Sequence, residues 1–141
     1  MKSLLLTMIL SIFIGCGTDI KHTQKSIDKT VPKLLLTYKN KSISLNDEME
    51  KILHQYISDY KSLFRGQRLI IKGFTDPRGD MNNNYRLGLL RANGIKVFLN
   101  KVDKDISKIT VVSLGGAKPV CKQKSLSCVD KNNRVELSFL P

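Results

Sequence analysis

A carboxylate and a guanidinium are spaced along this sequence so that they could hold one small charged ligand. Asp76 lies in a polar loop after an apolar run, and Asn84, Gly88 and Arg91 follow at positions i, i+4 and i+7. At about 100° per residue these three share one helix face, and the glycine leaves room beside the arginine. Arg91 could bind a carboxylate while Asp76 accepts from an ammonium group, which suits a zwitterion. A plain Asp76–Arg91 ion pair, or an arginine lying on the surface, would produce the same spacing.

Strand patterns surround these residues. Short apolar runs predict strands at 34–38, 69–71 and 109–112. Apolar residues alternate with polar ones over 134–139, which predicts a last strand. We expect the first strand to be buried and the last one to be half-exposed.

Two amphipathic helices are predicted between the strands. Ser44 and Asn46 offer caps for the first helix, whose apolar residues follow helical spacing until Gly66 ends it. The second helix covers 81–100. Strands that alternate with helices favour crossover connections, so part of the sheet should be parallel. The sequence predicts an α/β fold, an α+β sandwich of βαβαββ order, with one mixed sheet, a last strand antiparallel to a neighbour, and both helices on one face.

The first residues have the organisation of an export signal. Residues 1–15 join a lysine to a short apolar run, which is too short to span a bilayer. Residues 13–16, Phe-Ile-Gly-Cys, resemble the lipobox of bacterial lipoproteins, which implies that Cys16 carries lipid. An ordinary signal peptide or a short apolar helix remains the alternative. We expect a tether over 16–33 and one folded domain over 34–141. Gly17, where the enterobacterial sorting rule would place Asp for retention, implies the outer membrane.

The formal net charge of +12 concerns partners and not the fold. A nucleic-acid ligand, an anionic membrane or polymer, and a merely solvated lysine-rich surface are the three interpretations. The export signal and the absence of nucleic-acid-binding motifs disfavour nucleic acid.

Three segments resemble the motifs of OmpA-like domains. Residues 73–79, Gly-Phe-Thr-Asp-Pro-Arg-Gly, resemble the G-H-T-D-x-x-G signature, with Phe74 in place of histidine. Residues 84–99 keep every spacing of the helix motif N-x-x-L-S-x-x-R-A-x-x-V-x-x-x-L, with Gly88 in place of serine. Residues 132–136, Asn-Asn-Arg-Val-Glu, resemble N-R-R-V-E, with Asn133 in place of the first arginine. The resemblance covers roughly residues 34 to 140.

The resemblance implies a cell-wall anchor. It places Asp76 and Arg91 on the diaminopimelate of the peptidoglycan stem peptide, with Thr75 and Asn84 as supporting contacts and Arg134 at the rim. It implies a lipoprotein on the periplasmic face of the outer membrane that links this membrane to peptidoglycan, with envelope proteins as further partners. The alternative is a periplasmic scaffold, or a secretion-system accessory, with a weakened pocket.

The cysteines and the absence of catalytic patterns complete the expectations. Cys121 and Cys128 are a candidate disulfide in an exported protein, and OmpA-like lipoproteins often carry a similar pair. No further Cys or His lies near them, so we expect no metal and no cofactor. An enzyme is disfavoured because no nucleophile is paired with a base.

Overall fold

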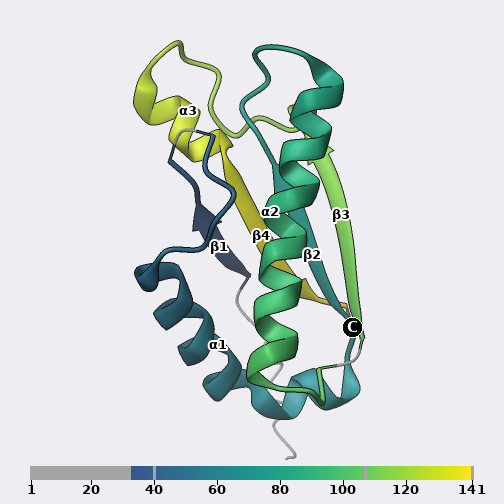
Figure 1. The fold of residues 1–141 in the computed structure, drawn as a ribbon. Helices are drawn as coiled ribbons and strands as arrows, with labels where there is room; N and C mark the ends of the chain where they lie inside the picture. The colour runs from purple at the N-terminus through teal and green to yellow at the C-terminus, as the bar shows by residue number, and fades with distance from the viewer. Residues whose placement is uncertain (1–32, 40, 107, 141) are drawn as a thin grey trace, which may run out of the picture.

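The described part of the chain is one four-stranded sheet with three helices (Figure 1). The computed structural model describes residues 33–39, 41–106 and 108–140. The predicted signal over 1–15, Cys16 and the tether up to residue 32 lie outside these ranges. The elements are β1 (Leu34–Thr37), α1 (Asp47–Gly66), β2 (Leu69–Phe74), α2 (Met81–Val102), β3 (Ile109–Gly115), α3 (Leu126–Asn132) and β4 (Arg134–Phe139).

The sheet is mixed, as predicted. Its strand order is β1-β4-β2-β3, where β2 and β3 are parallel and β4 is antiparallel to both of its neighbours. The last strand therefore lies inside the sheet, between the first two strands of the chain. The prediction of βαβαββ order is confirmed for the strands and for the two long helices.

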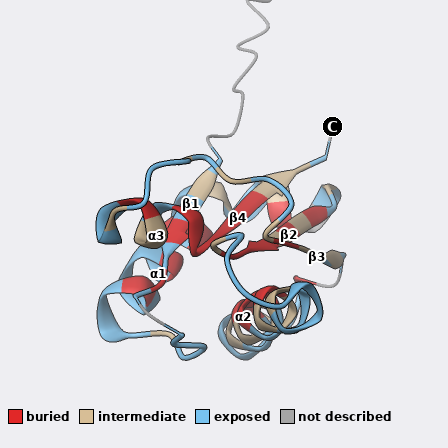
Figure 2. Cartoon of the chain, turned by 90° about the horizontal axis from the view of Figure 1, so that it is seen from above, coloured by how far each residue is buried: buried red, intermediate tan, exposed pale blue. Residues whose placement is uncertain are grey.

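The two long helices pack on the same face of the sheet (Figure 2). Asn46 caps α1 by accepting a hydrogen bond from the Met49 N–H at 2.9 Å, and α1 bends at Tyr60, whose φ of −118° and ψ of 20° are not helical. Asp80 caps α2 in the same way through the Asn83 N–H. The caps satisfy N–H groups that have no partner within a helix.

The core lies between this helix layer and the sheet. Alternate residues of each strand point toward the helices, because successive side chains of a strand face opposite sides. The innermost residues are Leu53 of α1, Ile95 and Leu99 of α2, Ile71 of β2, and Val135 and Leu137 of β4.

Three expectations about the elements were wrong. Strand β1 is an edge strand rather than a buried one, and Leu35 is 49% exposed. Strand β4 is not half-exposed, because its inner position covers even Arg134 and Glu136. The third helix, α3, was not predicted; it has seven residues, too few for a periodic pattern, and begins at a Ser125 cap.

Candidate functional site

Asp76 is placed by the end of strand β2. The ladder between β2 and β3 shifts register at Gly73 and Phe74, and the chain then leaves the sheet. The Asp76 carboxylate accepts from the Arg78 backbone N–H at 3.2 Å and from its Nε at 2.5 Å, and from Asn132 Nδ2 at 3.3 Å. Partial burial raises the pKa of this carboxyl, but the hydrogen bonds from Arg78 and Asn132 outweigh it, and the pKa lies below its usual range. Asp76 is therefore ionised at neutral pH.

Arg91 lies on α2 with its side chain fully buried. Its Nε donates to the Ser42 carbonyl oxygen at 2.8 Å, and its Nη1 donates to Asn133 Oδ1 at 2.9 Å. The Tyr38 ring centroid lies 4.9 Å from the guanidinium carbon, a cation–π geometry. Burial lowers the pKa of Arg91 to about 10, which still leaves it charged at neutral pH.

Asn133 connects the two charged residues. Its Oδ1 accepts from the Asp76 backbone N–H at 3.3 Å as well as from Arg91. Its Nδ2 donates to the Val129 carbonyl oxygen of α3 at 3.0 Å, which fixes the amide orientation. The carboxylate of Asp76 forms an ion pair with Arg78. Among the described residues, Asp76 and Arg91 are therefore joined through the side-chain amide of Asn133.

Thr75 and Asn84 hold the loop around Asp76. The Thr75 N–H donates to the Gly115 carbonyl oxygen, while its buried Oγ1 makes no hydrogen bond within the described part of the chain. Asn84 Nδ2 donates to the Arg78 carbonyl oxygen at 3.1 Å, which ties the first turn of α2 to the loop. Thr75 therefore adjoins Asp76, and Asn84 is tied to the same loop through Arg78.

Gly88 does not leave room for a ligand, contrary to the interpretation of its spacing. A Cβ at this position would lie 2.5 Å from Ser113 Oγ and 3.1 Å from the Gly73 carbonyl oxygen. The missing side chain lets α2 approach β2 and β3 closely, so the space is already filled by the sheet.

Arg134 faces away from Arg91, on the side of the sheet that α1 and α2 leave uncovered. Its Nε donates to Glu136 Oε1 at 2.8 Å, and its guanidinium carbon lies 3.9 Å from the centroid of the Phe74 ring. The structure therefore brings Thr75, Asp76 and Asn84 together, connects them to Arg91, and separates Arg134 from that group.

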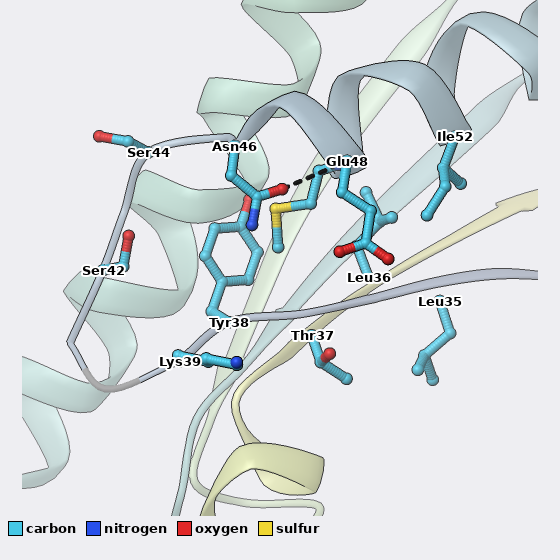
Figure 3. Close-up of a pocket in the computed structure, with 11 residues that line it drawn as sticks. Leu35, Leu36, Thr37, Tyr38, Lys39, Ser42, Ser44, Asn46, Glu48 and Ile52 are labelled. Carbon is cyan, nitrogen blue, oxygen red and sulfur yellow. Dashed lines mark hydrogen bonds between the residues drawn. The ribbon is translucent and has the colours of Figure 1, made fainter.

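Two hollows border the charged residues. One, of about 220 Å³, lies next to Asp76 and is lined by Pro77, Arg78, Pro119, Cys121, Lys122, Gln123, Lys124 and Asn132. The other, of about 240 Å³, lies between β1 and α1 and is lined partly by Tyr38 and Ser42 (Figure 3). Both of these residues contact Arg91. Burial raises the pKa of Tyr38 to about 12, so its hydroxyl stays neutral.

The predicted disulfide is present in the loop beside Asp76. Cys121 and Cys128 are joined, with their Cα atoms 5.3 Å apart. Asn132 accepts from the backbone N–H groups of Val120 and Cys121 and donates to the Cys121 carbonyl oxygen. The bridge and this asparagine therefore position the wall of the hollow.

Sequence reasoning missed four contributors to the site: Tyr38, Ser42, Asn132 and Asn133. Tyr38 could be assigned only to a strand, and Asn133 only to a departure from a motif. Ser42 acts through its carbonyl oxygen, which any residue would supply, so no sequence signal could have found it.

The described ranges contain neither a metal-binding cluster nor a membrane-spanning helix. No group of three or more His, Cys, Asp or Glu side chains is placed there to hold a metal ion. None of the helices in these ranges has the length and apolar character needed to cross a bilayer.

Comparison with known proteins identifies the class of domain. No family model matches the chain. The structure of the peptidoglycan-associated lipoprotein from Burkholderia pseudomallei superposes with a TM-score of 0.68 at 27% identity, covering 75% of this chain and 89% of that one. The C-terminal domain of Helicobacter pylori MotB gives a TM-score of 0.69 at 25% identity, covering 77% and 84%. The described fold is therefore an OmpA-like domain.

Sequence relatives place the chain within that class. The peptidoglycan-associated lipoprotein of Buchnera aphidicola is 28% identical over 116 residues, which are 79% of this chain and 66% of that protein. The one from Pseudomonas aeruginosa is 31% identical over 96 residues, 68% of this chain and 56% of that protein. The chain thus spans less than two thirds of the length of these relatives. It is related to the peptidoglycan-associated lipoproteins, and these relatives are not enzymes, which agrees with the expectation of a non-enzymatic protein.

Proposed function

We propose that this protein binds peptidoglycan non-covalently and anchors the outer membrane to the cell wall. The observation that carries the proposal is the shared amide of Asn133, whose oxygen accepts from the Asp76 backbone N–H and from Arg91 Nη1. It joins the residue that carries the carboxylate to the buried guanidinium. The names of the relatives, which are peptidoglycan-associated lipoproteins, support the same ligand.

Diaminopimelate of the stem peptide is the part of the polymer that this arrangement suits. It carries an ammonium and a carboxylate on one carbon, so Asp76 can accept from the first and Arg91 can donate to the second. Thr75 Oγ1 is buried next to Asp76 and supplies a hydroxyl to the same ligand. Asn84 keeps the loop in place through the Arg78 carbonyl oxygen.

Access to Arg91 sets a condition on binding. Because the guanidinium is fully buried and its Nε is hydrogen-bonded to the Ser42 carbonyl oxygen, a ligand carboxylate has to displace that oxygen. A hydrogen bond between two charged groups is stronger than one to a neutral carbonyl oxygen, so the exchange favours the ligand carboxylate by about 1–1.4 kcal/mol. The ammonium contact at Asp76 adds to this gain.

The membrane end of the anchor is the N-terminus. Cys16 would carry the lipid after removal of residues 1–15, and residues 16–33 would form the tether. Fully extended, a tether of this length reaches about 60 Å. Acyl chains on Cys16 would hold the chain to the periplasmic face of the outer membrane, and envelope proteins would be further partners.

Sedimentation with purified diaminopimelate-type peptidoglycan tests this function. Residues 17–141, which contain every described element, should cosediment at moderate salt, and Asp76→Ala and Arg91→Ala should remain in the supernatant. Arg86→Ala and Asp105→Ala change the same charges at exposed positions and should sediment like the unchanged protein. Equal sedimentation of all five proteins would show that binding follows net charge rather than this site.

The burial of Arg91 favours one alternative, a periplasmic scaffold whose pocket no longer binds the wall. In that case Arg91 would serve only to join α2 to the Ser42 carbonyl and to Asn133. The two candidates separate in the same experiment, since a scaffold would leave all of its variants, and the unchanged protein, in the supernatant.

A further inference from the structure

The face of the sheet opposite α1 and α2 carries a second concentration of charge. Side chains alternate along each strand, so Arg134 and Glu136 of β4 share this face with Lys72 and Phe74 of β2. No helix covers this face in the described part of the chain (Figure 2). It is separated from the Asp76 hollow by the loop that contains Pro119, which lines both spaces.

A groove of about 470 Å³ lies on this face. It is lined by Lys33, Lys72, Phe74, Leu114, Lys118, Pro119, Val120, Arg134 and Glu136. Four of these side chains are cationic and one is a carboxylate. The groove is therefore strongly positive.

The carboxylate in the groove is already engaged. Glu136 contacts Arg134 Nε at 2.8 Å and Lys33 Nζ at 2.5 Å. Arg134 is fixed further by the carbonyl oxygens of Asn132 and Lys118 and by the Phe74 ring. This buried pair therefore forms the floor, and Lys72 and Lys118 are left to meet an anion from outside.

The side chains that line the groove distinguish between classes of anion. Leu114 and Val120 add apolar surface beside the lysines, and Val120 is 61% exposed. A pure polyphosphate would gain nothing from these side chains, whereas an extended peptide can present carboxylates and apolar groups on its two sides.

We propose that this groove binds an acidic, extended segment of a protein partner, with its carboxylates on Lys72 and Lys118 and an apolar side chain against Leu114 and Val120. The groove lies outside the proposed peptidoglycan site, so one partner does not compete with the other for Asp76 or Arg91. Charge complementarity would speed the encounter, and the apolar contact would select among acidic segments.

A peptide titration tests the proposal. A fluorescein-labelled hexapeptide of alternating glutamate and leucine is added to residues 17–141, and its anisotropy is followed at about 0.15 M salt. The same peptide with glutamine in place of glutamate should bind about tenfold more weakly. The variant with Lys72→Gln and Lys118→Gln should lose about tenfold in affinity for the acidic peptide, since two charge contacts of roughly 0.7 kcal/mol each are removed.

A matched variant removes the effect of net charge. Lys51→Gln with Lys101→Gln makes the same charge change on the exposed surfaces of α1 and α2 and should bind like the unchanged protein. Thermal unfolding of both variants checks that the fold is kept. Equal binding by all three proteins, or equal binding of the two peptides, would overturn the proposal. Loss of binding to phosphatidylglycerol vesicles by the groove variant, without loss of peptide binding, would assign the lysines to lipid instead and would also overturn it.

Discussion

Replacing Gly73 by alanine should push helix α2 away from the sheet and weaken the whole domain. A Cβ at Gly73 would lie 2.0 Å from the Gly88 carbonyl oxygen, 2.5 Å from its carbonyl carbon and 3.0 Å from its Cα. All three atoms are backbone, so no rotamer change can relieve the overlap. Restoring an ordinary contact of about 3.5 Å requires the helix to move by roughly 1.5 Å.

The size of the effect follows from what the movement disrupts. Added methyl groups in packed regions cost about 1–3 kcal/mol, and a backbone-to-backbone overlap belongs at the upper end. A loss of about 3 kcal/mol would lower the melting temperature by roughly 12 to 24 °C in a domain of this size. Arg91 lies on the same helix, so its 2.9 Å hydrogen bond to Asn133 would also be stretched.

Thermal unfolding followed by circular dichroism measures this loss, with Gly66→Ala as the control. A Cβ at Gly66 meets nothing within 4 Å, so alanine there should be neutral or should stabilise by up to about 1 kcal/mol. If Gly73→Ala unfolds within about 0.5 kcal/mol of the unchanged protein, the close approach of α2 to β2 is not the constraint inferred here.

Three further changes should have measurable results. Reducing the Cys121–Cys128 bridge, which closes a loop with a sequence separation of 7, should cost about 2.5 kcal/mol on the chain-entropy model, and melting with and without reductant checks this. Burial alone would raise the pKa of Glu136, but Lys33 and Arg134 together hold that pKa below its usual range. Such a carboxylate stabilises the fold above its unfolded pKa, so the free energy of unfolding should decrease below about pH 4. Urea titrations at pH 7 and pH 3 measure this decrease, and Glu136→Gln should reduce it. Asn133→Leu keeps the number and branching of the side-chain heavy atoms but removes the acceptor shared by the Asp76 backbone N–H and Arg91, so it should destabilise by about 1–3 kcal/mol and weaken cosedimentation with peptidoglycan. Unchanged values in both measurements would contradict the linking role.

The order of strands and helices was predictable because local patterns encode it. Apolar spacing located α1 and α2, and Asn46 was correctly identified as a cap because its side chain acts on the next turn. The Cys121–Cys128 bridge was also predicted correctly. The position of a strand within the sheet was not predictable, because it depends on which distant segment pairs with it, and this is why β1 and β4 were assigned the wrong exposure.

In the candidate site, too, the arrangement of residues near one another in the sequence was predictable, and contacts between distant residues were not. Asp76, Thr75 and Asn84 lie within ten residues of one another, so the loop and the first turn of α2 bring them together. The surroundings of Arg91 come from residues 49 and 42 positions away, Ser42 and Asn133, and no pattern along the chain records those contacts. Gly88 was misinterpreted for the same reason, since what fills the space beside it is strands β2 and β3 and not a ligand.

Titration of two stem peptides against residues 17–141 tests the central claim most directly. One peptide carries diaminopimelate at its third position, and the other carries lysine, which lacks the second carboxylate. Diaminopimelate should bind roughly 5- to 10-fold more tightly, because with lysine Arg91 keeps its weaker bond to the Ser42 carbonyl oxygen and forgoes a gain of about 1–1.4 kcal/mol. Arg91→Lys should reduce this preference. Equal affinity for the two peptides, or a preference that Arg91→Lys leaves unchanged, would contradict that claim.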